Sequence, residues 1–255
     1  MHPVLVRFGP LTIHTYGVLV AAGFLLGLAL AVKQAKKEGI PQERIIDIGF
    51  YVLVAAIVGS RLFFVAVNAG HYLKHPLDIF KIWEGGLVFY GGLILALPSA
   101  LWYIRKHHLD GWRITDIFAP SIAIGHAVGR IGCFAAGCCH GRSAELPWSV
   151  TFYDPECLAT TGIPLHPTQL YESAGEFLNF LILITLRRYQ SFKGQLFWTY
   201  IFLYSVLRFV VEFFRGDEAR GYLFGGISVS QGISVIMGII AISVIAGKLL
   251  NKKGA

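Results

Sequence analysis

The chain has 255 residues, of which 55% are hydrophobic and 15% are charged, and its mean hydropathy is +0.61. This balance excludes an ordinary soluble domain of the same length and favours a chain embedded in a membrane. The net charge of +7 is explained by basic loops beside anionic lipid, and it does not require a nucleic-acid partner.

Seven apolar runs approach or exceed the roughly 20 residues that an α-helix needs to cross a bilayer. They cover residues 15–33, 45–67, 86–104, 114–135, 170–187, 194–214 and 225–247. The leader before the first run is short and nearly uncharged and has no small-residue cleavage site, so we expect a retained helix and not a signal peptide. The sequence therefore predicts an all-α integral membrane protein in which residues 1–255 form one seven-transmembrane helix bundle.

Lysine and arginine are unevenly distributed between the two sets of alternating segments outside these spans. One set holds thirteen: Lys33, Lys36, Lys37, Arg44, Arg105, Lys106, Arg113, Arg187, Arg188, Lys193, Lys248, Lys252 and Lys253. The other set holds six: Arg7, Lys74, Lys81, Arg142, Arg215 and Arg220. The positive-inside rule then predicts an N-terminus outside and a cytoplasmic C-terminus, which requires an odd number of spans.

Two segments between the spans have a character of their own. Residues 68–84 are polar with a helical apolar periodicity, which predicts an amphipathic helix on the outer membrane interface. Residues 134–170 contain four prolines, and the alternating pattern of Trp148–Tyr153 predicts a small extracytoplasmic head with short strands. We see no internal repeat, which disfavours a transporter built from duplicated halves.

Arg130 lies in an apolar, glycine-rich stretch, HAVGRIGCFAAGCCHG, from His126 to Gly141. A guanidinium in hydrocarbon costs at least ~2.5–3.5 kcal/mol, so such a residue usually faces a protein interior or a polar ligand. A phospholipid phosphate is the anion most available there, and arginine binds phosphate through two parallel N–H bonds. The alternative is an arginine that pairs with a neighbouring carboxylate and only holds helices together.

Further polar residues fall toward the outer ends of the spans. Tyr16 begins the first span, Arg61 lies in the outer half of the second, and Glu172 and Glu176 open the fifth. Four residues of the sixth run share one helix face: Tyr204, Arg208, Glu212 and Arg215. They form either a self-compensated ladder of ion pairs or, with Arg61 and Arg130, a cationic site for an anionic headgroup.

Two glycine pairs, Gly85–Gly86 and Gly91–Gly92, bracket the sequence LVFY. Small residues let helices pack closely, and they also leave room for a lipid or a peptide backbone. We expect Tyr90, which lies between the two pairs at the start of a span, to line a site.

The chain has four cysteines, Cys133, Cys138, Cys139 and Cys157. The spacing C-x4-C-C-H matches no ordinary zinc pattern, so we predict no metal site. If the outer face is oxidising, Cys157 is expected to form a disulfide with Cys138 or Cys139. Cys133 is expected to pack as a small buried hydrophobe.

The segment HPTQLYE, from His166 to Glu172, opens the fifth span. Pro167 suits a first helical position, and the polar side chains after it can satisfy the first amides. The segment is either a helix start alone, or His166 and Glu172 form a titratable pair at the rim of a cationic cavity. Such a pair could take a proton from a thiol or a hydroxyl.

Motifs run through the chain in a fixed order: HTYG at His14–Gly17, GSRL at Gly59–Leu62, GGLVFYGG, GRIGCFAAGCCHGR, HPTQLYE and Y-x3-R-x3-E-x2-R from Tyr204 to Arg215. Together they resemble the prolipoprotein diacylglyceryl transferase family nearly end to end. The resemblance implies a seven-helix fold with an external head in the bacterial cytoplasmic (inner) membrane, with no cofactor and no metal. It also implies transfer of the diacylglyceryl group of phosphatidylglycerol to the lipobox cysteine of a prolipoprotein, the first step of lipoprotein maturation, with release of glycerol phosphate.

Carried over to this chain, the resemblance implies that Arg130 and Arg208 hold the lipid phosphate. The expected catalytic residues are Arg130, Arg208, His166 and Tyr90. The expected substrate-binding residues also include Tyr16, Arg61, Gly141, Glu172, Tyr204 and Glu212. The expected partners are phosphatidylglycerol, prolipoprotein signal peptides and membrane lipids, with no nucleic acid.

The chain departs from the family pattern at three positions, Tyr90, Cys133 and Cys138. Well-known members have histidine in place of Tyr90, and asparagine and glutamate in place of Cys133 and Cys138. The group that deprotonates the thiol is then Tyr90, His166 or His140, or the arginines lower the thiol pKa sufficiently. Two other functions stay open: a transporter or flippase for anionic lipids or small anions, and a non-catalytic homologue that binds lipoprotein signal peptides.

Overall fold

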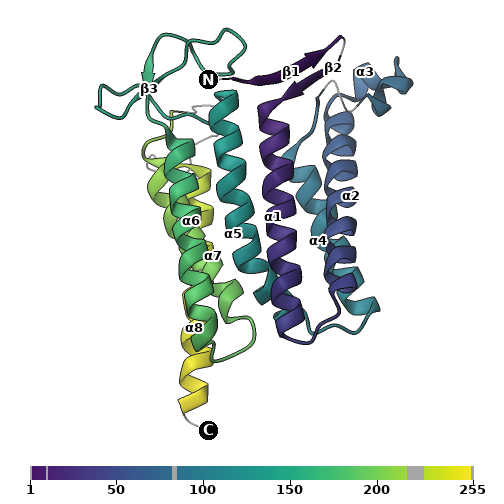
Figure 1. The fold of residues 1–255 in the computed structure, drawn as a ribbon, viewed down its shortest axis with the longest axis vertical. Coiled ribbons are helices and arrows are strands. Elements are labelled where there is room, and N and C mark those ends of the chain that lie inside the picture. Colours follow the sequence, from purple (N-terminus) through teal and green to yellow (C-terminus); the bar gives the residue numbers. More distant parts are fainter. Residues whose placement is uncertain (1, 10, 82–84, 217–226, 254–255) are drawn as a thin grey trace. The chain divides into compact units, whose positions relative to one another are not determined.

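The computed structural model describes residues 2–9, 11–81, 85–216 and 227–253, and most of these residues are helical (Figure 1). The long helices are α1 (Thr15–Lys37), α2 (Gln42–Val67), α4 (Phe89–Lys106), α5 (Gly111–Ala136), α6 (Thr168–Leu186), α7 (Gln195–Glu212) and α8 (Val229–Lys253). Within the described ranges a long helix thus occupies each of the seven positions expected from hydropathy. The first two residues of the last expected run, 225–226, lie outside the described residues.

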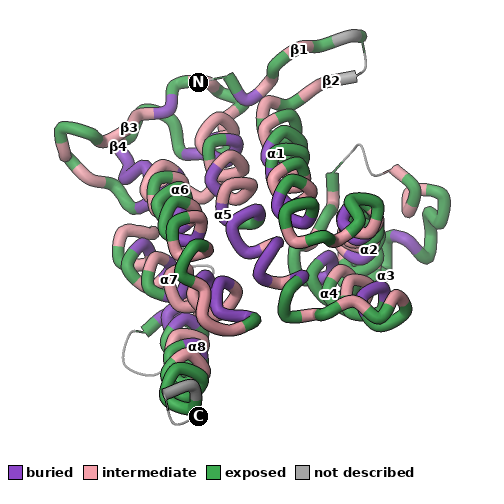
Figure 2. Tube along the Cα trace, turned by 60° about the horizontal axis from the view of Figure 1, so that its bottom comes forward, coloured by how far each residue is buried: buried purple, intermediate pink, exposed green. Residues whose placement is uncertain are grey.

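Four of the described helices, α1, α2, α5 and α8, are long and apolar enough to cross a membrane. The other three long helices, α4, α6 and α7, have 18 or 19 residues and each includes charged side chains. Many residues along the long helices are exposed (green in Figure 2), and these include large apolar ones such as Leu25 and Ile236, which are 63% and 60% exposed. The residues with buried polar side chains include Glu172, Glu176 and Arg208. This inverted distribution is the one expected where the solvent is lipid.

The chain divides into two compact units, residues 1–30 with 115–255, and residues 31–114. In the second unit α2 packs along α4. A Cβ added to Gly91 would lie 2.4 Å from the carbonyl oxygen of Gly59, so only glycine allows this approach. Close helix packing is therefore one function of the Gly91–Gly92 pair.

In the first unit α1 meets α5 at small residues, and α7 packs against both α6 and α8. A Cβ on Gly23 would lie 2.7 Å from the carbonyl oxygen of Gly125. A small apolar core joins α5, α6 and α7. Its buried members are Ala119, Ala123, Leu183, Leu196 and Tyr200.

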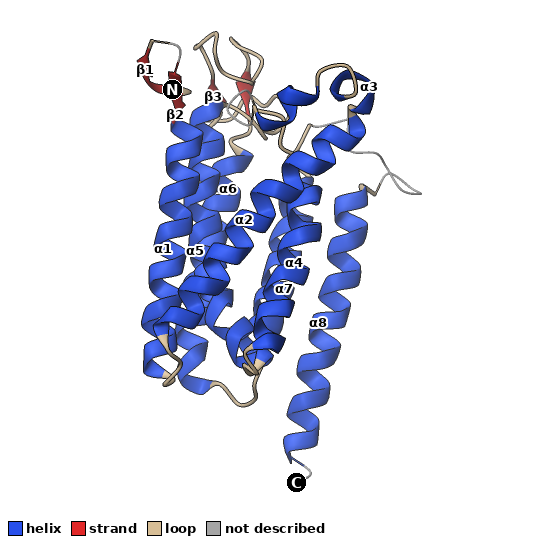
Figure 3. Cartoon of the chain, turned by 90° about the vertical axis from the view of Figure 1, so that its right-hand side faces the viewer, coloured by secondary structure: helices blue, strands red, loops and turns tan. Residues whose placement is uncertain are grey.

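The strands are few and short (Figure 3). β1 (Val4–Phe8) and β2 (Leu11–His14) form an antiparallel hairpin that the sequence analysis did not predict. β3 (Val150–Thr151) lies in the stretch where a strand was expected, and it pairs with β4 (Pro164–Leu165). Phe152 and Leu165 are buried in a separate small core of residues 134–165.

The predicted amphipathic helix at residues 68–84 is wrong. The segment contains a single turn, α3 (Ala69–Tyr72), and a 3-10 helix, η1 (Pro76–Phe80), while residues 82–84 lie outside the described residues. Pro76 has no N–H to donate and disfavours helical backbone in the residue before it, which separates the two pieces. Leu73, Leu77 and Phe80 are nonetheless highly exposed.

Asp116 connects α5 to the start of α7. Its carboxylate accepts hydrogen bonds from the Gln190 side chain at 2.5 Å, from the Gly194 amide at 2.6 Å and from the Phe197 amide at 3.0 Å. Gly194 is the N-cap of α7, so a carboxylate from another helix satisfies amides that a helix start leaves unpaired. Asp116 is only 2% exposed.

We expect Asp116→Ala to lower the stability of the protein by about 2–3 kcal/mol, because buried donors lose their acceptor. Thermal unfolding of the detergent-solubilised protein measures this as a lower Tm. Asp110→Ala is the matched control, since Asp110 is exposed and accepts one amide hydrogen bond, from Arg113 at 3.3 Å. Equal Tm values for the two variants would contradict the capping role.

Candidate functional site

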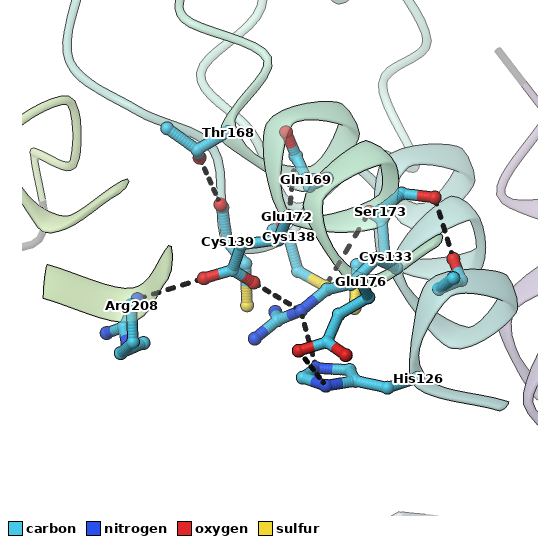
Figure 4. A network of polar contacts seen from close by, with 12 residues as sticks. His126, Cys133, Cys138, Cys139, Thr168, Gln169, Glu172, Ser173, Glu176 and Arg208 are labelled. Atoms are coloured by element: carbon cyan, nitrogen blue, oxygen red, sulfur yellow. Dashed lines mark hydrogen bonds and ion pairs between the residues drawn. The ribbon is translucent and has the colours of Figure 1, made fainter. Parts of the chain in front are cut away.

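Three helices of the first unit turn polar stripes toward one interior region. The stripes are His126 and Arg130 on α5, Glu172 and Glu176 on α6, and Tyr204, Arg208 and Glu212 on α7. Within each helix the members are four residues apart, so they share a face. In Figure 4, His126, Glu172, Glu176 and Arg208 point toward one another.

Glu172 is the centre of the charged network. Arg130 Nε forms an ion pair with Oε2 of Glu172, and Arg208 Nη1 lies 2.9 Å from Oε1. Arg215, which follows α7, lies 3.5 Å from the same Oε1. The Glu172 side chain is 2% exposed, and a carboxylate so deeply buried is stable only when cations and hydrogen bonds surround it.

A second carboxylate, Glu212, binds the other amino group of Arg208 at 2.6 Å. Three arginines thus contact two glutamates of this network. The ion pair expected on α7, Arg208 with Glu212, does form, and the network extends to α6 and α5. The pairing of the α7 stripe is therefore observed, and its use as a headgroup site stays a prediction.

A histidine and a third glutamate lie against this network. His126 Nδ1 is 3.4 Å from Glu176 Oε1, and Arg130 Nε donates a hydrogen bond to His126 Nε2 at 3.2 Å. The His126 ring lies 5.6 Å from the Tyr204 ring, centroid to centroid. Glu176 is fully buried. A carboxylate on one ring nitrogen fixes the orientation of the imidazole.

Arg130 and Arg208 use their guanidinium groups differently. Among the described residues, the polar contacts of Arg130 all run through Nε. Its two terminal amino groups therefore remain for a further anion, and two parallel N–H bonds match a phosphate. Arg208 has both terminal groups occupied, one by Glu172 and the other by Glu212 and Ser230.

Comparisons with known proteins identify the family of the chain. A family model described as prolipoprotein diacylglyceryl transferase matches residues 3–246. The chain is similar to two proteins named phosphatidylglycerol–prolipoprotein diacylglyceryl transferase. One is from Finegoldia magna and is 38% identical, and the other is from Geobacillus kaustophilus and is 36% identical. The alignments cover 93% and 94% of this chain and 90% of each relative. A third, from Bacillus velezensis, is 34% identical over 95% of this chain and 90% of its own length.

The chain belongs to the prolipoprotein diacylglyceryl transferase family. The family and the apolar helices together make it a multi-pass membrane protein. The resemblance stated from the motifs is thereby confirmed.

Gly141, expected in the site of this family, lies where backbone segments converge beside the arginines. Its amide donates to the His166 carbonyl at 2.9 Å, and Gly141 pairs with Arg215 in an isolated antiparallel bridge. A Cβ there would lie 2.3 Å from the Phe214 carbonyl oxygen and 2.6 Å from His166 Cβ. Glycine is thus required for packing, and it positions Arg215 against Glu172.

The expected pair of His166 and Glu172 is not formed. His166 is buried and its Nδ1 lies 3.2 Å from the Tyr171 hydroxyl, with the Phe214 ring at 5.3 Å, while the partners of Glu172 are the arginines. Burial, with a smaller contribution from the charge of Arg142, lowers the pKa of His166. His166 precedes α6 and Glu172 lies inside it, so the two side chains leave the backbone in different directions.

The expected disulfide is not present, because all four cysteines are free thiols. Cys157 packs in the small core around Phe152. Cys138 and Cys139 instead lie with Cys133, and the three sulfur atoms are within 4.8 Å of one another. Hydrogen bonds from the Cys133 and Cys138 thiols, and one from Arg215, lower the pKa of the Cys139 thiol. Cys133 is buried as expected, but in a thiol cluster.

Arg61 belongs to the second unit, and backbone carbonyls surround its guanidinium. It donates to Asp78 at 2.5 Å, to Ile79 and Gly85 at 2.8 Å, and to Gly86 at 3.3 Å. These contacts indicate that Arg61 anchors the segment between α3 and α4. A lipid-binding role for Arg61 is therefore not favoured.

Tyr16 and Tyr90, both expected in the site, lie in different units. Tyr16 packs on α5, since a Cβ built on Gly132 would lie 3.4 Å from Tyr16 Cδ2. Tyr90 is in the second unit, in the first turn of α4, where it is 65% exposed and packs edge-on against Phe89. A site-lining role for Tyr90 stays a prediction.

Three members of the network were not among the expected site residues: His126, Glu176 and Arg215. His126 precedes Arg130 by four residues, and this spacing within an apolar run was a usable signal. Arg215 was noted at the end of the α7 stripe. Its position depends on the backbone bridge to Gly141, which no local pattern predicts.

We expect Arg208→Gln to lower stability by about 3–5 kcal/mol, because it leaves Glu172 and Glu212 buried with fewer cations. Thermal unfolding in detergent measures the loss, with Arg142→Gln as control because Arg142 is exposed. The double variant Arg208→Gln with Glu212→Gln should recover part of the loss. A Tm for Arg208→Gln equal to that of Arg142→Gln would contradict the network.

Proposed function

We propose that this enzyme transfers the diacylglyceryl group of phosphatidylglycerol to the thiol of a prolipoprotein's lipobox cysteine and releases glycerol phosphate. The observation that carries the proposal is the pair of Arg130 terminal amino groups without a partner among the described residues, within a buried network of arginines and glutamates, in a chain that the family model matches over residues 3–246. The names of the relatives supply both substrates. These names describe a transferase and do not favour a transporter.

The lipid phosphate binds to the two terminal amino groups of Arg130 in this proposal. Arg208 contributes positive charge and holds Glu172 and Glu212 in place. Glu172 in turn fixes Arg130 through Nε, so the guanidinium is already oriented before the lipid arrives. Such preorganised charge is the main means by which enzymes stabilise a developing anion.

The reaction is a displacement at the sn-3 carbon of the diacylglyceryl moiety. The thiolate sulfur forms a bond to this carbon, and the bond from the carbon to the phosphate oxygen breaks. The electron pair leaves with glycerol phosphate, whose charge Arg130 and Arg208 stabilise. The thiol proton passes to a base, and the products are a thioether and glycerol phosphate.

His126 is the base that we propose. Its Nδ1 faces the buried Glu176, and its Nε2 is held by Arg130 at 3.2 Å. Once Arg130 Nε donates to Glu172 alone, Nε2 can accept the proton of the incoming thiol. Tyr90, His166 and His140 are the alternatives, and among the described residues they contact Phe89, Tyr171 and the Gly141 carbonyl, none of which is a carboxylate.

The remaining site residues line the substrate in this proposal. Tyr16 and Tyr204 flank Arg130 from α1 and α7, and Gly141 forms the wall toward Arg215. The three polar stripes lie at the ends of α5, α6 and α7 that adjoin residues 137–167. A lipobox cysteine presented at this end would meet the lipid headgroup.

The seven long helices are seven spans of the bacterial cytoplasmic membrane in our proposal, with the N-terminus outside. The excess of lysine and arginine in alternate segments supports this orientation. Residues 134–170 then form the extracytoplasmic head, on the side where prolipoproteins are modified. Leu73, Leu77 and Phe80, which are exposed, suit an interface between headgroups and acyl chains.

We expect Arg130→Lys to reduce transfer by an order of magnitude or more and to raise the KM for phosphatidylglycerol, because lysine keeps the charge but cannot form two parallel bonds. The assay follows glycerol phosphate release and thioether formation on a lipobox peptide, with purified protein and phosphatidylglycerol vesicles. Arg142→Lys is the control. Activity of Arg130→Lys within twofold of the parent would remove Arg130 from the site, and lipid movement without glycerol phosphate would favour a flippase.

We expect His126→Gln to lower kcat by at least ~10²-fold with little change in the KM for lipid, the usual scale for a lost general base. His166→Ala and Tyr90→Phe are the comparison variants, and both should stay within about tenfold of the parent. A fully active His126→Gln with an inactive His166→Ala would assign the base to His166.

A further inference from the structure

The three clustered thiols are brought together by the way α5 ends. Gly137 has a φ of +74°, its amide donates to the Phe134 carbonyl, and the Cys138 amide donates to the Cys133 carbonyl. This pair of bonds is the Schellman motif, in which the side chains at the positions of Cys133 and Cys138 meet, normally as an apolar contact. In this chain both positions are cysteine.

The third thiol is positioned by strained backbone and by buried polar side chains. Cys139 has a φ of +60°, which is uncommon for a residue with a Cβ. Its carbonyl accepts a hydrogen bond from Thr168 at 2.8 Å, and the Cys138 carbonyl accepts one from Gln169 at 2.7 Å. Thr168 and Gln169 are fully buried. The thiol cluster is thus fixed from both α5 and α6 (Figure 4).

The spacing of the sulfur atoms suits a metal ion bound by three thiolates. All three lie within 4.8 Å of one another, and among the described residues the group consists of these cysteines. Metal–sulfur bonds of about 2.3 Å put three sulfurs around one ion about 4 Å apart. Thiolates select soft ions such as Cu(I) and Zn(II), and three sulfurs without a fourth ligand match the planar coordination of Cu(I).

The surrounding charge is also favourable. Arg215 pairs through a backbone bridge with Gly141, two residues after Cys139. Arg130 lies about one turn before Cys133 on α5. Three thiolates and one Cu(I) carry two negative charges, so the ion-loaded cluster would compete with Glu172 for these two arginines.

We propose that Cys133, Cys138 and Cys139 bind one soft metal ion, Cu(I), in a site separate from the polar stripes but next to Arg130. Binding releases the thiol protons and involves no change of oxidation state. Because the ion-loaded cluster attracts Arg130 and Arg215, occupancy should weaken the binding of phosphatidylglycerol, a consequence that rests on the proposed function.

The test uses purified, reduced full-length protein in detergent. Cu(I) is supplied in competition with a coloured Cu(I) chelator, and bound copper is counted after desalting. We expect one ion for each parent molecule and for Cys157→Ser, the matched control that removes a thiol outside the cluster. The Cu(I) affinities of Cys133→Ser, Cys138→Ser and Cys139→Ser should each fall by more than about 100-fold. Loss of a residue that only hydrogen-bonds to a metal ligand already lowers metal affinity by about 10- to 100-fold, and loss of a ligand should cost more.

A second measurement on the parent protein alone keeps the proposal testable if a variant misfolds. Cu(I) should protect three thiols from a maleimide reagent while Cys157 stays as reactive as in the apoprotein. Three outcomes would overturn the site. They are equal copper binding by the parent and Cys138→Ser, loss of copper binding in Cys157→Ser, and thiols that Cu(I) does not protect from maleimide. The effect on the KM for phosphatidylglycerol is measured separately, so that an inactive preparation does not bear on metal binding.

Discussion

The buried carboxylate of Glu172 is the constraint on which the site depends. A carboxylate that is 2% exposed in an apolar surrounding must be compensated, and three arginines from α5, α7 and the segment after α7 do this. The requirement ties the helix ends together and fixes the direction of each guanidinium. Arg130 and Arg208, which a sequence comparison treats alike, thereby acquire different tasks: one presents open donors, and the other keeps the carboxylates in place.

The same arrangement links membrane residence to chemistry. Large apolar side chains are exposed along the long helices, while Glu172, Glu176 and Arg208 are buried. There the low dielectric strengthens both the pairing of Arg130 with Glu172 and the interaction of His126 with Glu176. Phosphate recognition and proton transfer are thus coupled through a single side chain, because Arg130 Nε contacts both Glu172 and His126.

Hydropathy predicted where the long helices lie, and four of the described helices are long and apolar enough to cross a membrane. The predicted amphipathic helix failed at Pro76, and the β1–β2 hairpin was missed because its strands have only five and four residues. Within the site, Arg130 and Arg208 were predictable as charges in apolar runs, whereas the carbonyl partners of Arg61 were not, since the backbone acceptors carry no sequence signal. The expected disulfide of Cys157 was wrong because the end of α5 directs Cys138 toward Cys133.

An experimental structure of the protein with bound phosphatidylglycerol tests the central claim most directly. The account predicts the lipid phosphate within hydrogen-bond distance of both terminal amino groups of Arg130, with Glu172 still paired to Arg208 and the sn-3 carbon open on the side of His126. A phosphate bound to Arg208 with Glu172 displaced, or a headgroup that does not contact Arg130, would contradict it.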